Sequence, residues 1–290
     1  MQIHLEEIPG PGGLHPSREL PVFSPITSAP GIRKSCLIFP LLVFLTFLPG
    51  CRSAGHPGPV DRSDVPIEII EVGKHIRVVQ DGNYWGANSV FYVSDSAIFF
   101  IDGTYVPQTA RRVIWKSMTE GLGEFKGVLV SSYHVHRTGG LSAFHEKEIP
   151  VLATVETEKQ IRLRWPLMKK QMELFVTWPD PPMPLISRTV RKSGTLFDGK
   201  VEAIMLPPCY APGNMAFFFP EEKVLYAGSI LSIPLFFDNQ VNPAEMKRCL
   251  SILKAKAPKT IIAGHGSPLR GPEFLQEFEL YLKARARSED

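Results

Sequence analysis

The stretch from residue 131 to residue 140, Ser-Ser-Tyr-His-Val-His-Arg-Thr-Gly-Gly, constrains the fold more than any other part of the chain. It follows the apolar run 128–130, which predicts a buried strand. Residues two apart at the end of a strand point to the same side, so His134 and His136 can aim both imidazoles at one point. Such a pair can begin a metal site, because neutral imidazole is a good zinc ligand.

A third histidine follows another β-branched run near the C-terminus. His265 stands between two glycines after the run 259–263, and the glycines free the backbone to turn sharply there. Together the three histidines predict one shared metal site made of His134, His136 and His265. The alternative interpretation is that the first two are polar loop residues and the third is a turn residue.

Composition and charge limit the function classes. The chain has 290 residues, of which 44% are hydrophobic and 21% are charged, and this is an ordinary globular composition. A net charge of +3 is too small to indicate nucleic-acid binding. Without its leader, the chain keeps about 240 residues, which is enough for one sizeable core. The sequence indicates no particular oligomeric state.

The first 50 residues resemble a leader rather than part of the domain. Residues 1–30 are rich in proline and show no helical or strand period, which predicts disorder. A short basic stretch then precedes the apolar run 36–48, whose length fits a secretory signal segment and is too short to span a bilayer. Residues 1–50 are therefore interpreted as a disordered prefix plus a signal peptide.

The end of the apolar run predicts an attachment point. Leu48-Pro49-Gly50-Cys51 resembles the lipobox of bacterial lipoproteins, and this resemblance implies an acylated Cys51 that anchors the protein to a membrane. Residues 51–65 would then be the anchor and a flexible tether. Ordinary signal-peptide cleavage nearby is the alternative. In either case we expect a bacterial cell-envelope location, membrane-anchored or periplasmic.

Hydrophobic periodicity divides residues 66–290 into two halves of strands followed by helices. Turn-separated β-rich runs predict strands at 67–72, 75–80, 89–93, 97–102, 127–131, 150–153, 189–191, 201–206, 215–219 and 224–226, with another leading to His265. Apolar stripes predict helices after Thr104, around 161–175 with a kink or break at Pro166, from Asn242-Pro243 to Pro258, and after Pro272. This order favours two sheets packed face to face with helices outside.

Five motifs carry a resemblance to a known family. They are residues 88–90 together with 101–104, the segment 131–140 (called the histidine loop below), 210–214, 220–228 and 264–266. In this order they resemble the metallo-β-lactamase superfamily over about residues 67–287. The resemblance implies an α+β fold, the αββα sandwich of two mixed sheets with outer helices, in one domain over residues 66–290. It also implies one or two zinc ions along the edge between the sheets.

The chain departs from the family at most ligand positions. The family's loop contains His-x-His-x-Asp before its Gly-Gly pair. When the two sequences are aligned on Gly139-Gly140, Ser132 stands at the first histidine, His134 at the second and His136 at the aspartate. Tyr210 stands where the family has a histidine, and Ser229 where it has Asp or Cys. A serine hydroxyl is a poor zinc ligand. We therefore expect one zinc ion, or none if the protein is not an enzyme.

The resemblance also implies supporting roles. Asp102 matches the family's strand-end aspartate and would orient a histidine or Arg137, although a carboxylate at a helix start is an equal alternative. Hydroxyls of Ser132 and Tyr210 could donate to an oxyanion or leaving group. Further candidates at the metal or beside its ligands are Cys209, Ser229 and Arg137.

Two further features keep alternatives open. Tyr84-Trp85, in the predicted hairpin loop 81–86, could cover an apolar substrate or be an exposed pair without a role. Cys209 and Cys249 could form a disulfide in an oxidising compartment or stay buried as small apolar residues. We favour the unpaired state.

The predicted function is metal-dependent hydrolysis of an amide, lactam or ester carbonyl. Asp102 would orient a histidine or Arg137, and the hydroxyls of Ser132 and Tyr210 would donate hydrogen bonds. In keeping with this function, the partner that we expect is a small-molecule substrate. Ser232 stands where zinc β-lactamases of the closest type have a lysine that binds the drug's carboxylate, so we expect inefficient hydrolysis of β-lactams. The alternative is a non-catalytic binding or scaffold protein of the envelope on the same fold.

Overall fold

The computed structural model describes residues 5–7, 67–81, 86–173, 182–233, 235 and 241–286. The predictions for the signal peptide, Cys51, the tether and the pair Tyr84-Trp85 fall outside these ranges. None of the helices within them has the length and apolar character needed to cross a lipid bilayer.

The first sheet has eight strands in the order β1-β8-β7-β6-β5-β4-β3-β2. β2 to β5 form an antiparallel meander, β5 to β8 run parallel, and β1 pairs antiparallel with β8. The strands are β1 Leu5–Glu7, β2 Ile67–Val72, β3 Ile76–Asp81, β4 Ala87–Ser94, β5 Ala97–Ile101, β6 Glu124–Leu129, β7 Val151–Thr154 and β8 Arg188–Val190. The short strand β1 differs from the prediction, which expected no strand in residues 1–30.

The second sheet has six strands in the order β14-β13-β12-β11-β10-β9. Only the pair β12 and β13 is parallel, so this sheet is mixed as well. Its strands are β9 Gly194–Leu196, β10 Val201–Met205, β11 Met215–Phe219, β12 Val224–Tyr226, β13 Thr260–Ile262 and β14 Leu269–Arg270. The sequence predicted four of these runs and missed the two short strands β9 and β14.

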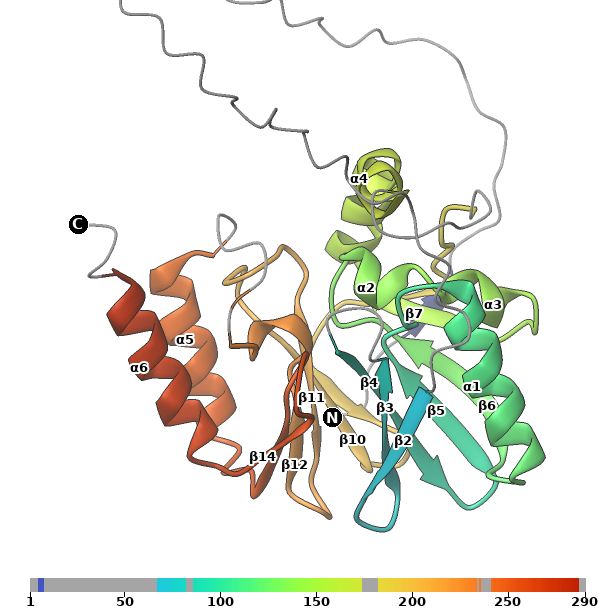
Figure 1. Ribbon diagram of the computed structural model, residues 1–290, viewed down its shortest axis with the longest axis horizontal. Helices are drawn as coiled ribbons and strands as arrows, with labels where there is room; N and C mark the ends of the chain where they lie inside the picture. The colour runs from blue at the N-terminus through green and yellow to red at the C-terminus, as the bar shows by residue number, and fades with distance from the viewer. Residues whose placement is uncertain are drawn as a thin grey trace, which may run out of the picture. The chain divides into compact units, whose positions relative to one another are not determined.

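Helices cover the outer faces of the two sheets (Figure 1). α5 and α6 lie outside the second sheet, and α1 and α3 lie outside the first. The helices are α1 Pro107–Thr119, α2 Val135–Thr138, α3 Leu141–His145, α4 Val155–Glu173, the 3-10 turn η1 Gly228–Ile230, α5 Pro243–Lys254 and α6 Phe274–Ala286. This arrangement confirms the predicted α+β sandwich of two mixed sheets with outer helices.

Helix ends partly follow the sequence signals. The Asn242 side chain accepts a hydrogen bond from the Glu245 amide and caps α5, as its sequence indicated. Thr104 does not cap α1, because the residue before that helix is Val106 and the Thr104 hydroxyl donates to the Val106 carbonyl instead. Pro166 does not divide α4, which continues through it to Glu173.

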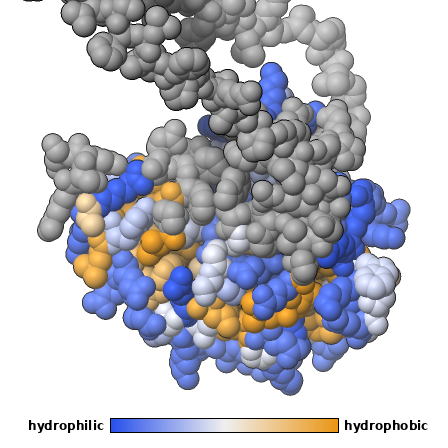
Figure 2. Space-filling model, viewed as in Figure 1, coloured by the Kyte–Doolittle hydropathy of each residue, from blue (hydrophilic) through white to orange (hydrophobic). Residues whose placement is uncertain are grey.

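Alternating strand residues build two buried layers. Ile101 and Phe217 belong to the cluster between the sheets, whereas their neighbours Phe100 and Phe218 pack on the helix side, as expected from the two-residue period of a strand. Tyr92 stacks on Phe219 across the sandwich, with ring centroids 5.8 Å apart. On the face shown in Figure 2, hydrophilic side chains make up most of the rim of the described surface, and hydrophobic ones gather toward its middle.

Phe100→Ala tests the helix-side layer. The Phe100 side chain is fully buried, and its ring lies 5.2 Å from that of Phe144 and 6.1 Å from that of Phe91, measured between centroids. We expect a loss of about 3–5 kcal/mol in the free energy of unfolding, because the truncation leaves a cavity. Urea unfolding followed by circular dichroism measures it. Leu163→Ala is the control, since that side chain is 69% exposed, and a loss of equal size there would contradict this packing.

Candidate active site

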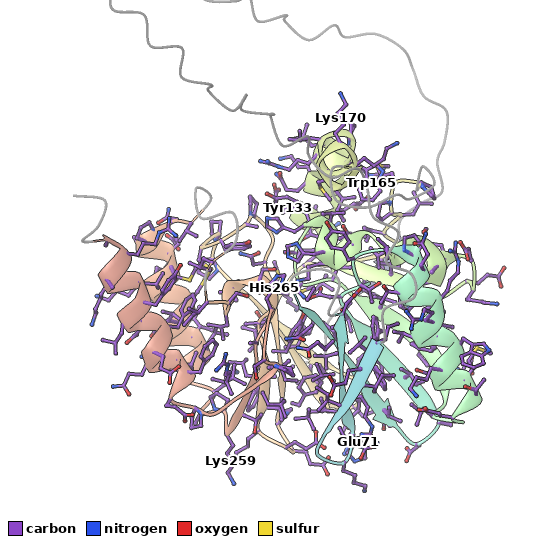
Figure 3. All side chains as sticks on the ribbon, in the orientation of Figure 1. Glu71, Tyr133, Trp165, Lys170, Lys259 and His265 are labelled. Carbon is purple, nitrogen blue, oxygen red and sulfur yellow. A yellow bond between two sulfur atoms is a disulfide. The ribbon has the colours of Figure 1, made fainter. Side chains whose placement is uncertain are left out.

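The candidate residues meet where the two sheets come together at one edge. Asp102 follows β5, the histidine loop follows β6, Ser229 follows β12 and His265 follows β13. Within each sheet these neighbouring strands are parallel, so their carboxyl ends open on the same edge. In Figure 3, His265 lies between the two sheets, below Tyr133 and the helix α4 that carries Trp165.

Two glycines allow this close approach. A Cβ atom on Gly139 would collide with the Tyr105 carbonyl, and one on Gly264 would collide with the Gly228 carbonyl. Only glycine fits at such contacts. The loop before α3 therefore packs against the segment after β5, and the loop after β13 packs against η1, which brings the histidines of the two halves together.

The three histidines form a chain of ring contacts. The ring centroids of His134 and His136 are 5.5 Å apart, and those of His136 and His265 are 4.9 Å apart. All three side chains are buried, with relative exposures of 7% or less. The structure thus brings the predicted metal-ligating histidines into one cluster.

Hydroxyl groups divide this cluster into two sets. The Ser132 Oγ atom lies 3.2 Å from Nδ1 of His134, and the Tyr210 ring centroid is 5.0 Å from that of His134. Ser229 Oγ lies 2.6 Å from Nε2 of His136. Ser132, His134 and Tyr210 thus form one set, while His136, Ser229 and His265 form the other.

A buried ion pair lies directly behind the histidines. Arg137 Nε is 3.5 Å from Asp102 Oδ2, and neither side chain is exposed. The carboxylate accepts hydrogen bonds from the Ser131 amide at 2.7 Å, the Ser131 hydroxyl at 2.8 Å and the Tyr226 hydroxyl at 2.6 Å. The expected contact of Asp102 with Arg137 is therefore present. Asp102 is not a carboxylate at a helix start, because α1 begins five residues later at Pro107.

Arg137 uses each of its nitrogens in this network. Nη1 donates to the Asn88 carbonyl at 2.6 Å and Nη2 to the Gly264 carbonyl at 2.8 Å. Nε donates to Ser229 Oγ at 3.1 Å. The guanidinium thereby connects β4 and α2 of the first half to the loops after β12 and β13.

Burial dominates the electrostatics of the site. It raises the pKa of Asp102, and this rise is opposed by Arg137 and by the hydrogen bonds from Tyr226 and Ser131. Burial lowers the pKa of His136 well below its ordinary value, and the charges of Arg137, His265 and His134 add to this effect. His136 is therefore a neutral imidazole near neutral pH.

Sequence reasoning missed several parts of this network. Tyr226, Ser131 and Asn88 carry the hydrogen bonds that surround Asp102 and Arg137, yet none was given a role although each lies in a motif noted from the sequence. One signal was available, because Tyr226 is a hydroxyl-bearing residue at the end of an apolar strand within a family motif. A buried tyrosine hydroxyl at such a position requires a polar partner.

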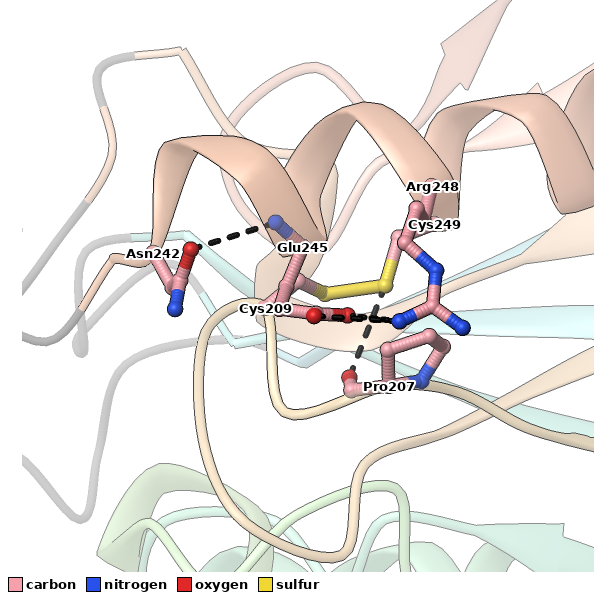
Figure 4. The surroundings of a disulfide bond; sticks show 6 residues. All are labelled: Pro207, Cys209, Asn242, Glu245, Arg248 and Cys249. Atoms are coloured by element: carbon pink, nitrogen blue, oxygen red, sulfur yellow. Dashed lines mark hydrogen bonds and ion pairs between the residues drawn. A yellow bond between two sulfur atoms is a disulfide. The ribbon is translucent and has the colours of Figure 1, made fainter.

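The cysteine prediction was wrong. Cys209 and Cys249 form a disulfide that connects the loop before β11 to α5, as Figure 4 shows beside the Asn242 cap. The pairing could not be read from spacing alone, since it depends on where α5 packs. A disulfide sulfur is not a thiolate, so Cys209 is not a substitute zinc ligand.

The donor atoms at this edge decide whether zinc ions could bind there. Within the part of the chain that the structure describes, no group of three or more His, Cys, Asp or Glu side chains is arranged as a metal site. Hydroxyls at Ser132, Tyr210 and Ser229 do not fit two zinc ions, because neutral hydroxyls are weak ligands. In donor type, the three imidazoles of His134, His136 and His265 fit a single ion.

Two mixed sheets packed face to face, with helices outside and polar loops at the common strand-end edge, define the metallo-β-lactamase fold. Solved structures support this assignment. The crystal structure of DIM-1 metallo-β-lactamase matches with a TM-score of 0.61 at 16% identity, over 76% of this chain and 99% of that one. The mono-zinc form of FIM-1 from Pseudomonas aeruginosa matches with a TM-score of 0.61 at 14% identity, over 79% and 98%.

Sequence comparison agrees with the structural match. A metallo-β-lactamase type 2 from Pseudomonas aeruginosa is 20% identical over 172 residues, which cover 58% of this chain. The match spans 63% of that relative's length. No family model matches the chain. At these identities the likeness establishes the fold and leaves the activity to be argued from the site.

Arg137→Met tests whether the buried ion pair holds the sandwich together. The change leaves the Asp102 carboxylate without its cation, so we expect a loss of about 3–5 kcal/mol in the free energy of unfolding. The double variant Arg137→Met with Asp102→Asn should lose much less free energy of unfolding than the two single variants lose together, because the two groups interact directly. Urea unfolding of the four proteins measures this coupling, and strictly additive losses would contradict it.

The control for Arg137→Met is Arg248→Met. Arg248 bonds Glu245 on the exposed surface of α5 at 2.9 Å. Exposed pairs contribute about 0–1 kcal/mol, so this variant should unfold nearly as the parent does.

Removing both cysteines tests the disulfide. The bond closes a sequence separation of 40 residues, and we expect Cys209→Ala with Cys249→Ala to lower the free energy of unfolding by about 2–5 kcal/mol. Reductant should destabilise the parent and leave the variant unchanged. Peptide mapping without reductant should recover both cysteines in one linked fragment, whereas two separate fragments would disprove the bond.

Proposed function

We propose that this protein is a metal-dependent hydrolase that cleaves an amide, lactam or ester and binds a single divalent ion with His134, His136 and His265. The observation that carries the proposal is the convergence of three buried imidazoles at the strand-end edge of a metallo-β-lactamase fold. Three histidines with an open fourth position are a known set of ligands for catalytic zinc.

The chemistry divides between the ion and the chain. When bound, a divalent metal supplies a polarised carbonyl and a water that ionises near neutral pH. Ser132 and Tyr210, beside His134, offer hydroxyl donors to an oxyanion or a leaving group. Arg137 acts by positioning, because its donors are used by Asn88, Gly264 and Ser229.

Ser232 limits the range of substrates. It is buried, with 1% relative exposure, and the family resemblance places it where a lysine would bind the carboxylate of a β-lactam drug. Without a cation at that position, a carboxylate-bearing β-lactam loses an ionic contact. We therefore expect slow β-lactam hydrolysis compared with neutral amides or esters.

The second candidate function is a non-catalytic binding or scaffold protein on the same fold. The observation that favours it is the presence of hydroxyl groups at three family ligand positions, Ser132, Tyr210 and Ser229, each already placed against an imidazole or the Arg137 network. The envelope location and the lipid anchor at Cys51 remain predictions under either function.

Zinc titration separates the two functions. We expect metal-free protein to bind close to one zinc per chain, because the donor set serves one ion. His134→Ala and His265→Ala should each abolish zinc binding and hydrolysis of ester, amide and nitrocefin substrates supplied with zinc. Calorimetry, metal analysis after desalting and substrate assays measure these results.

The control variant is His145→Ala. His145 lies at the end of α3, where its Nε2 accepts from the Leu185 amide, away from the candidate site. This variant should keep the zinc stoichiometry and activity of the parent. A parent protein that retains no zinc after loading contradicts the hydrolase and supports the binding protein.

A further inference from the structure

Ser229 makes two short contacts that the proposed hydrolysis does not use. Its Oγ atom lies 2.6 Å from Nε2 of His136 and 3.1 Å from Nε of Arg137. All three side chains are buried, with relative exposures of 2% or less. The serine therefore lies between a permanent cation and a ring that could bind a metal.

The direction of the hydrogen bonds follows from the chemistry of the groups. The guanidinium of Arg137 can only donate, so Ser229 Oγ accepts from its Nε. Within the described residues, the other hydrogen-bond partner of this hydroxyl is Nε2 of His136. A buried hydroxyl proton needs an acceptor of its own, and Nε2 of His136 supplies one when the neutral ring carries its proton on Nδ1.

The surrounding backbone holds the serine in this position. Ser229 is in η1, which is closed by a hydrogen bond from the Ile230 amide to the Ala227 carbonyl. Gly228 has a positive φ of 52°, and a Cβ there would press on the Ser131 hydroxyl. The turn is thus packed against Ser131, which itself bonds Asp102.

We infer that Ser229 is a positioning residue that holds Nε2 of His136 by hydrogen bonding, sets the tautomer of this ring and weakens metal binding through it. The part concerning metal rests on the proposed function, whereas the part concerning the tautomer does not. A carboxylate or thiolate at this position would be a ligand, but the Ser229 hydroxyl is a donor that occupies the same nitrogen. A metal that binds Nε2 must first displace it.

The first test reads the ring directly in the full-length, metal-free protein. Nitrogen-15 NMR of the imidazoles should show an unprotonated Nε2 and a protonated Nδ1 for His136. Ser229→Ala should shift the Nε2 signal, and Ser229→Thr, which keeps a hydroxyl, should retain it. Ser132→Ala is the matched control, because it removes the hydroxyl beside His134 and should leave the His136 signals in place.

A protonated Nε2 in the parent, or a His136 signal that Ser229→Ala leaves unchanged, overturns the inference. Backbone amide spectra confirm that each variant is folded. A purely structural serine would alter stability without moving the ring nitrogens selectively.

The second test measures zinc affinity by competition with a chelating dye. Ser229→Ala should bind zinc about three- to tenfold more tightly than the parent, which is the scale of one lost hydrogen bond. Equal or weaker binding would mean that the hydroxyl does not compete with the metal, and would overturn that part of the inference. If neither protein binds zinc, the proposed function fails, and the ring signals alone decide the role of Ser229.

Discussion

The interaction on which the rest of the structure depends is the buried pair of Arg137 and Asp102. A guanidinium with no exposure to water is costly unless each of its donors is satisfied. Here the acceptors come from β4, η1 and the loop after β13, and Asp102 and Tyr226 complete the set. Because these acceptors belong to both sheets, one charge couples the two halves of the sandwich.

The same pair determines how the candidate site is built. Arg137 Nε donates to the Ser229 oxygen, and the same oxygen lies 2.6 Å from Nε2 of His136. His134 lies on the other side, with Ser132 and Tyr210. The strand-end edge thus contains imidazoles paired with hydroxyls, and the ion-pair network behind them sets the orientation of the central ring.

Much of the fold was predictable because apolar alternation is a local property. The runs 67–72, 215–219 and 224–226 form strands with the predicted boundaries. The errors concern features whose energy is not local. β1, β9 and β14 are short strands that form by pairing with neighbouring strands. Thr104 does not cap α1, because its hydroxyl donates to the Val106 carbonyl. The disulfide likewise depends on the packing of α5.

The sequence by itself determined the sandwich class and placed His134, His136 and His265 in the segments that follow two strands. The expected position of His134 and His136 at a strand end was wrong, because β6 ends at Leu129, His134 precedes α2 and His136 lies within it. The strands follow from hydrophobic periodicity, and the correspondence of Ser132 and His136 to family ligand positions follows from the resemblance of residues 131–140 to the family's motif. Only the tertiary structure decided that Tyr226 and Ser131 enclose Asp102, that Cys209 is bonded to Cys249, and that Ser229 faces Nε2 of His136. Each of these contacts joins residues from separate elements, and their partners are chosen by the packing of one sheet on the other rather than by neighbours in the chain.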